Sequence, residues 1–322
     1  MGLDDGGGEK LIFKTCGKVY VANAVCYHEI VCMQQDKEIS ALFSLIDDPD
    51  EEVFGAVSNR IAHYGRNLIP NLEHLWETTP NEQVQHRIES LIHRLQLQDL
   101  QNDLVAWKTA AQPELLAGAL LCTRFQYPDL TIAPVLSEME KLRRNVWLEL
   151  NNYLTPLEQI NVLTSILFSY YGLKGKAKDY TRPEEFLLQT VLSSKKGNGF
   201  GNGIIYLLLC EGLDIPIKPI RIPGQFILAY FKPVLQPQGQ RIQSVEKIEY
   251  FIEPASGQIF TRKEVDGYFK KMNVAPEQSF FTPLSNVETI ALIMTELAQC
   301  FDSEPERYKK EELLALAKLL QD

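Results

Sequence analysis

Four glycines occupy every second position from 197 to 203, and a compact apolar run follows them at 204–210. Glycine gives the backbone conformational freedom, and the apolar run predicts a short buried helix whose first turn faces the glycine loop. The free N–H groups and the positive dipole end of such a first turn make it a natural place for an anion or an oxyanion. Asn198 and Asn202 could add side-chain hydrogen bonds to a ligand there.

Two phosphate-binding motifs are excluded for this loop. Asn202 stands where the dinucleotide-binding pattern G-x-G-x-x-G would place its third glycine. The loop also lacks the Gly-Lys-Ser/Thr ending of a P-loop. The sequence therefore predicts no nucleotide cofactor, and no other cofactor is expected.

Thiol–imidazole chemistry in this part of the chain is excluded by the distribution of histidine. A cysteine nucleophile needs a base that holds it as thiolate and usually a third group that orients the base. All five histidines of the chain precede Ala106. Cys210 lies about three helical turns beyond Gly199, at the wrong end of the predicted helix, and is expected to be buried packing.

Three segments around the loop carry a likeness to a known family. They are SILFSYYGLKGKAKDY, which ends at Tyr180, EEFLLQTVLSSKKGN, which ends at Asn198, and the helix with its LDIP turn and IPGQFILAYF. Together they resemble the bacterial SirB family of transglutaminase-like/TPR proteins, within the transglutaminase-like, cysteine-protease-like superfamily. The resemblance covers roughly residues 130 to 275 and implies a domain of helices plus an antiparallel sheet.

The catalytic positions that the resemblance implies hold other residues in this chain. The cysteine position falls on Gly199, the histidine position on Gln225, and the aspartate position on Glu253 of FIEPASG. Gln225 and Glu253 are expected on adjacent antiparallel strands, where the second and third members of a triad would face the helix. The triad is therefore degenerate, and no catalytic residue is expected at these positions.

The leading hypothesis is a catalytically inactive transglutaminase-like pseudoenzyme that binds or scaffolds a protein or peptide partner. A peptide or amide-bearing ligand would lie over Gly199 and contact the binding candidates Asn198, Asn202, Gln225 and Glu253. The alternative is a hydrolase of amide or peptide bonds with non-cysteine chemistry, in which Glu253 acts as a general base on water. A purely structural protein is the third possibility.

The contents of the space around the helix start distinguish these hypotheses. Convergence of the three triad positions in an open groove would favour a ligand site. Filling of that groove by Phe200 or Phe226 would favour a scaffold.

The composition excludes several other classes of function. The chain has 322 residues, of which 45% are hydrophobic and 23% charged, which is typical of a soluble globular protein. A formal net charge of -10 argues against nucleic-acid and anionic-membrane partners, because these need a basic face. No apolar run approaches the roughly 18 to 20 residues of a membrane span, and no signal peptide is recognisable, so a cytoplasmic location is expected. Cys26, His28 and Cys32 lack a fourth ligand, so no metal site is expected.

The chain before the resemblance has two parts. Residues 1–32 lack helical periodicity, whereas an amphipathic helix begins directly after Met33. This contrast predicts a non-native or disordered extension with Met33 as the natural start, or alternatively a small strand-forming arm. In residues 33–129, prolines recur roughly thirty residues apart near the start of predicted helices, which predicts a HEAT-like helical repeat region. These are Pro49, Pro80 and Pro113.

The overall prediction is an α+β, mostly α, chain. Residues 130–275 would form the transglutaminase-like domain, with two long helices first, the second capped by Thr155, and strands after the central helix. An apolar stripe that includes Trp147 and Tyr153 is expected in its core. Residues 276–322 would form a C-terminal TPR-like helical hairpin.

Overall fold

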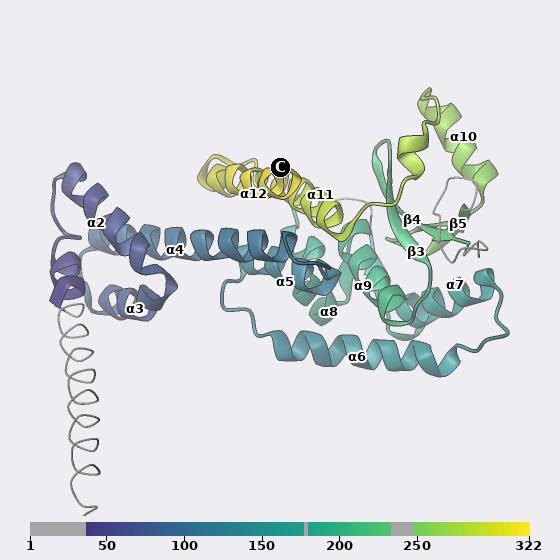
Figure 1. Ribbon diagram of the computed structural model, residues 1–322, viewed down its shortest axis with the longest axis horizontal. Coiled ribbons are helices and arrows are strands. Elements are labelled where there is room, and N and C mark those ends of the chain that lie inside the picture. Colours follow the sequence, from purple (N-terminus) through teal and green to yellow (C-terminus); the bar gives the residue numbers. More distant parts are fainter. Residues whose placement is uncertain (1–36, 177–179, 233–247) are drawn as a thin grey trace, which may run out of the picture. The chain divides into compact units, whose positions relative to one another are not determined.

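The structure is a computed structural model that describes residues 37–176, 180–232 and 248–322 (Figure 1). Its chain divides into two compact units at Asp99/Leu100. The second unit includes α5 (Leu115–Gln126), which packs against other helices of that unit, and the domain bounds expected from the sequence stay predictions. The extension predicted over residues 1–32 lies outside the described residues.

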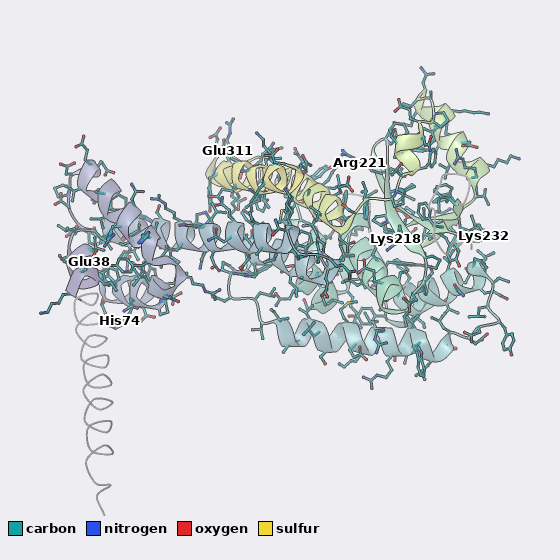
Figure 2. The ribbon with its side chains drawn as sticks, viewed as in Figure 1. Glu38, His74, Lys218, Arg221, Lys232 and Glu311 are labelled. Atoms are coloured by element: carbon teal, nitrogen blue, oxygen red, sulfur yellow. The ribbon has the colours of Figure 1, made fainter. Side chains whose placement is uncertain are left out.

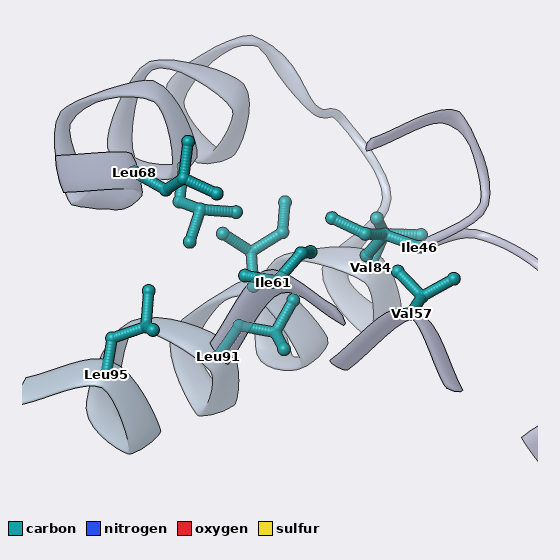
Figure 3. Close-up of a cluster of buried hydrophobic side chains, with 9 residues drawn as sticks. Ile46, Val57, Ile61, Leu68, Val84, Leu91 and Leu95 are labelled. Carbon is teal, nitrogen blue, oxygen red and sulfur yellow. The ribbon is translucent and has the colours of Figure 1, made fainter. Parts of the chain in front are cut away.

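The first unit is helical, and its helices start where the sequence signals place them. It contains a helix over residues 37–44, α2 (Glu51–Tyr64), η1 (Gly65–Leu68), α3 (Ile69–Thr78) and the first part of α4 (Glu82–Lys108). Asp50 caps α2, because its Oδ1 accepts a hydrogen bond from Glu52 N at 2.8 Å. Apolar side chains from these helices meet in one core that includes Ile46, Ile61, Leu91 and Leu95 (Figure 3).

The prolines of the repeat pattern have a regular place in the structure. Pro49, Pro80 and Pro113 each stand two positions before the first residue of a helix, namely α2, α4 and α5. A proline just ahead of a helix costs no intrahelical hydrogen bond, because the first N–H groups of a helix have no partner within it. The pattern therefore located helix starts correctly, and the HEAT-like type of repeat stays a prediction.

The second unit is mostly helical with a small antiparallel sheet, as predicted. The strands are β3 (Ile217–Ile222), β4 (Gln225–Phe231), β5 (Ile248–Glu253) and β6 (Gln258–Phe260), paired in that order. Further helices are α6 (Ile132–Glu149), α7 (Pro156–Thr164), η2 (Ser165–Tyr170), η3 (Pro183–Phe186), α8 (Leu188–Ser194), α9 (Gly199–Gly212), α10 (Arg262–Met272), η5 (Gln278–Phe281), α11 (Asn286–Ala298), η6 (Glu304–Glu306) and α12 (Arg307–Gln321). Two short segments, β1 (Lys174–Gly175) and β2 (Lys196–Gly197), pair in parallel.

The four-stranded sheet has a helix on each face. Ile227 and Ala229 of β4 and Phe251 of β5 share a buried cluster with Val265 and Phe269 of α10. Because successive side chains of a strand point to opposite faces, the even-numbered residues of β4 point the other way, toward α9. Both faces are covered, so α9 and α10 lie on different sides of the sheet (Figure 1).

The capped helix was predicted correctly, whereas the predicted apolar stripe was wrong. Thr155 forms a capping box with Glu158 at the start of α7: its N–H donates to Glu158 Oε2 at 2.7 Å. Trp147 is 61% exposed and Tyr153 is 96% exposed, so neither is in the core. The reason is that α6 ends at Glu149 and buries the face that carries Val135, Leu142 and Val146.

The last two helices of the chain form a hairpin. α11 and α12 pack against each other, and α11 also packs on α5, which makes the pair part of the second unit. Among the described helices, none combines the length and the apolar character that a membrane span requires.

Candidate functional site

The start of α9 is closed by its own N-cap residue. The Asn198 side chain is fully buried, and its Oδ1 accepts hydrogen bonds from Phe200 N at 2.9 Å and from Gly201 N at 3.1 Å. These are two of the N–H groups that a helix leaves without an internal partner. An anion at this end of the helix would therefore have to compete with the Asn198 cap.

The second asparagine of the loop is equally buried and holds two parts of the domain together. Asn202 is 1% exposed, and its Nδ2 donates a hydrogen bond to the carbonyl oxygen of Ala255 at 3.2 Å. The bond ties the first turn of α9 to the turn that follows β5. Asn198 and Asn202 were predicted as ligand contacts, but a ligand on the surface cannot reach side chains with this burial.

The interior of this loop is polar. Among the described residues, three buried side-chain atoms here lack a hydrogen-bond partner: Oε2 of Glu185, Nδ2 of Asn198 and Oδ1 of Asn202. The carbonyl oxygen of Glu185 accepts a hydrogen bond from Asn198 N at 3.2 Å. A methyl group on Gly201 would collide with that carbonyl oxygen, so the close approach of the two segments requires glycine at this position.

Gly199, the predicted cysteine position, has room for a small side chain. A Cβ at Gly199 would lie 3.7 Å from Cγ of Pro254, which is ordinary van der Waals contact. One turn later on the same helix face, a Cβ at Gly203 would lie 2.7 Å from Cε1 of Phe226 and 3.3 Å from Cβ of Pro254. Phe226 and Pro254 are therefore the residues that cover the Gly199/Gly203 face of α9.

The structure does not bring the other two triad positions to this face. β4 and β5 are adjacent and antiparallel, with Leu228 opposite Ile252, as the sequence predicted. Gln225 shares the strand face of Ile227, and Glu253 shares that of Phe251, so both belong to the face that α10 covers. By this alternation Gln225 and Glu253 point away from α9, although Gln225, the first residue of β4, also lines a small hollow beside Phe200.

Glu253 is occupied within its own turn. Its carboxylate accepts hydrogen bonds from Ser256 N at 3.2 Å and from Ser256 Oγ. Such an arrangement stabilises the turn between β5 and β6. It gives Glu253 a structural role that needs no ligand.

A row of four aromatic rings runs from the loop before α8 to β4. The centroids of Tyr180 and Phe186 are 6.4 Å apart, those of Phe186 and Phe200 are 5.7 Å apart, and those of Phe200 and Phe226 are 5.0 Å apart. Phe186, Phe200 and Phe226 are buried. Tyr180 donates a hydrogen bond to Glu296 Oε2 at 2.7 Å, and burial together with this carboxylate raises the pKa of Tyr180 to about 12.

The hollow beside this row is too small for a peptide. It measures about 40 Å³, and its lining includes Phe200, Phe226, Gln225, Glu296 and Arg221 of β3. Arg221 is labelled in Figure 2. Ligand pockets of enzymes are roughly 300 to 1,000 Å³. Phe200 and Phe226 both line this small hollow beside the helix.

The described part of the chain contains no set of side chains that could bind a metal ion. No group of three or more histidine, cysteine, aspartate and glutamate side chains is close enough there to hold an ion. Cys26, His28 and Cys32 lie outside the described residues.

Sequence reasoning named Phe226 as a residue that could fill the groove, but it missed Pro254, which lies beside both Gly199 and Gly203. Gln225 and Glu253, the chain neighbours of Phe226 and Pro254, were chosen because the histidine and aspartate positions that the family likeness implies fall on them. The apolar character of Phe226, next to Gln225 in β4, was the signal that could have identified the inward-facing residue.

Comparison with known proteins agrees with this architecture. A family model described as the transglutaminase-like superfamily matches residues 133–295. Protein SirB1 of Salmonella typhimurium is 24% identical over 187 residues, which are 57% of this chain and 65% of that protein. The UPF0162 protein YchA of Escherichia coli is 24% identical over 180 residues, or 56% of this chain and 62% of that protein.

A third relative is the UPF0162 protein BU173 of Buchnera aphidicola, 22% identical over 193 residues, which are 60% of this chain and 67% of that protein. The chain thus spans less than two thirds of the length of the SirB1 and YchA proteins that it matches. No solved structure matches the chain. Because the family model covers just over half of the chain, the protein belongs to the transglutaminase-like superfamily, and its likeness to SirB1 and YchA supports a place in the SirB family.

Proposed function

We propose that this protein is a pseudoenzyme: a transglutaminase-like domain without the superfamily's chemistry, used as a protein- or peptide-binding and scaffolding module. The observation that supports the proposal is the packing on one face of α9, where Phe226 and Pro254 lie against Gly203 and Pro254 lies beside Gly199. Nucleophilic catalysis at this face needs a base beside the nucleophile, and an aromatic ring and a proline supply none.

Two further features support a non-catalytic role. Gly199 itself carries no nucleophile, and the N–H groups of the helix start are used by Asn198. Both asparagines are buried and hydrogen-bonded to the backbone of the domain. Excess negative charge makes a protein partner a better fit than a nucleic acid or an anionic membrane.

The alternative of a hydrolase with Glu253 as general base has less support. The Glu253 carboxylate is hydrogen-bonded to Ser256 in its own turn and lies on the α10 face of the sheet.

A cytoplasmic location suits the protein, because the buried thiols of Cys122 and Cys210 are unpaired.

The proposal is tested by putting the superfamily's residues back. The variant Gly199→Cys is compared with the triple variant Gly199→Cys/Gln225→His/Glu253→Asp. Iodoacetamide labelling of the peptide that contains position 199 is followed by mass spectrometry between about pH 5 and pH 9. We expect the same pH profile for both variants, because the new imidazole would be on the opposite sheet face from the thiol.

Labelling that persists well below pH 7 only in the triple variant would show that the three triad positions still face one another, and would overturn the packing of Phe226 and Pro254 as the feature that carries the proposal. It would show an imidazole close enough to hold a thiolate, since paired catalytic thiols have a pKa of about 3.5 to 7.5. The Cys122 peptide in the same digest is the internal control, because this thiol is buried and stays unlabelled only while the domain is folded.

A further inference from the structure

A larger groove lies at the opposite end of α9, between that helix, the start of α5 and one face of α6. Its volume is about 510 Å³. Its apolar lining comprises Leu115, Leu116, Leu136, Met139, Leu208 and Leu209. Leu115, Met139 and Leu209 are buried at its floor, whereas Leu136 is 45% exposed and gives the groove an apolar surface open to solvent.

The rim of the groove is acidic. Glu114, Glu140 and Glu211 line it together with one cation, Arg143. Arg143 is already paired, because its Nε and Nη2 donate to the two carboxylate oxygens of Glu140, each at 2.8 Å. The Arg143 stem also packs beside Gly212, where a Cβ would lie 3.1 Å from Arg143 Cδ.

Two carboxylates therefore remain to set the charge of the groove. Glu114 and Glu211 are exposed, and Glu211 accepts one hydrogen bond, from Asn286 Nδ2 at 3.2 Å. α9 ends at Gly212 beside this rim without a lysine or arginine in its last turn, and its carbonyl end is the negative end of the helix dipole. The potential at this place favours a cation.

Exposed apolar residues of α6 continue the groove on both sides of the Arg143–Glu140 pair. At about 3.6 residues per turn, Ile132, Leu136 and Trp147 fall on the same face of the helix as Arg143. Ile132 is 43% exposed and Trp147 is 61% exposed. Exposed tryptophan and leucine in one strip are typical of protein-binding surfaces, where large rigid side chains supply most of the affinity.

We infer that this groove and the exposed Ile132 and Trp147 bind an amphipathic helical segment of a protein partner that carries apolar side chains on one face and lysine or arginine beside them. Helix-in-groove recognition of this kind reads apolar anchors at helical spacing. A second copy of the chain fits less well, because a net charge of -10 makes two copies repel. The inference deepens the proposed binding role, on which it rests, by naming its surface and the chemistry of the partner.

The test uses a synthetic, fluorescein-labelled amphipathic peptide of about 18 residues, composed of leucine at helical spacing and lysine. A peptide with glutamate in place of lysine and a scrambled leucine/lysine peptide serve as comparators. Fluorescence anisotropy with the full chain is measured at several salt concentrations. We expect the amphipathic lysine peptide to bind at least about tenfold more tightly than either comparator, with affinity falling as salt rises.

Two matched pairs of variants locate the binding. Leu136→Ser should weaken binding at least about fivefold, because it removes an apolar anchor, whereas Leu148→Ser should leave the affinity within about twofold. Leu148 is 66% exposed on the same helix, but about 120° around it from Leu136. Glu211→Gln should weaken binding and its salt dependence, whereas Glu277→Gln, an exposed glutamate on another surface, should not.

Several outcomes would overturn the inference. One is binding of the scrambled peptide as tight as that of the amphipathic lysine peptide. A second is a loss of affinity in Leu148→Ser as large as that in Leu136→Ser. A third is no binding of the lysine peptide to a chain whose thermal melt is normal. Sedimentation that shows a dimer lost in Leu136→Ser would identify a second copy as the occupant and would also overturn it. None of these outcomes bears on the alkylation profile at position 199, so a failed groove and a failed pseudoenzyme proposal are distinguishable.

Discussion

Alanine at Gly203 would place a methyl group 2.7 Å from Cε1 of Phe226 and 3.3 Å from Cβ of Pro254. Carbon atoms do not approach to 2.7 Å without displacement of one of them, and the Phe226 ring is held by its stack on Phe200. Alanine at Gly199, four residues earlier on the same helix, would meet only Pro254 Cγ at 3.7 Å. The same substitution on the same face is therefore expected to have opposite effects.

The magnitude follows from two opposing contributions. Alanine in place of glycine stabilises a helix interior by about 1 kcal/mol, and by less in the first turn. Overpacking of a core costs about 1 to 3 kcal/mol. Gly199→Ala should therefore raise the free energy of unfolding by up to about 1 kcal/mol, whereas Gly203→Ala should lower it by up to about 2 kcal/mol.

The assay must report on the second unit by itself, because a chain of two units need not unfold in one step. Urea unfolding is followed by hydrogen exchange of peptides from α9 and β4. Adding Phe226→Leu to Gly203→Ala should recover part of the loss, since it removes the ring atom that the methyl group meets. A Gly203→Ala midpoint at or above that of Gly199→Ala would refute the packing of Phe226 on α9.

Three more predictions concern the cap, the thiols and the response to acid. Asn198→Ala should lower the free energy of unfolding of the second unit by about 1 to 2 kcal/mol, because two buried N–H groups lose their acceptor. The loss is measured as a lower urea midpoint, and an unchanged midpoint would contradict the cap. Iodoacetamide at pH 8 should label the partly exposed Cys300 before Cys122, whose pKa burial raises to about 12; peptide mapping by mass spectrometry checks the order. Hydrogen bonds from the backbone and side chain of Thr261 lower the pKa of Glu264 below its ordinary value of 4.5, so its stabilisation is present above that pH and is lost as pH falls through the folded-state pKa. Between pH 6 and pH 3 the melting temperature of Glu264→Gln should therefore fall less than that of the unmodified protein. An equal fall would exclude the capping box as a source of acid sensitivity.

Local signals were sufficient to predict where most elements begin. The cap at Thr155 and the prolines before α2, α4 and α5 act within one helical turn, so neighbouring residues decide the outcome. The strands of the sheet and the buried helix after Gly199 were predicted for the same reason, because turn residues and apolar runs delimit them.

The direction of side chains in β4 could not be predicted. This strand is apolar at almost every position, since α9 covers one face of the sheet and α10 the other. A strand buried on both faces has no polar–apolar alternation that would tell which residues point to which side. The family likeness identified Gln225 and Glu253 as the positions along the chain that correspond to the triad. The alternation of side chains in the pleated strand, which the likeness does not reveal, makes Phe226 the residue that points to α9.

Trp147 shows a second limit. Its spacing from Leu150 and Leu154 suits a buried stripe only if the helix continues, and α6 ends at Glu149. Local sequence did not identify that end, because no glycine or proline marks it. The contacts of α5 with α11 join segments far apart in the sequence, so local signals could not predict them either.

The packing of the chain's end onto α4 and α5 has a consequence for synthesis on the ribosome. Lys108 Nζ donates a hydrogen bond to the carbonyl oxygen of Leu319 at 3.0 Å, and Asn286 Nδ2 donates to that of Pro113 at 3.0 Å. These partners are separated by 211 and 173 residues, so neither bond can form before the later segment has left the exit tunnel. The core of the first unit is made of residues 46–95 and can close early in translation. The α11-facing apolar surface of α5 stays uncovered until α11 has emerged, and exposed apolar surface of this kind favours aggregation of a nascent chain.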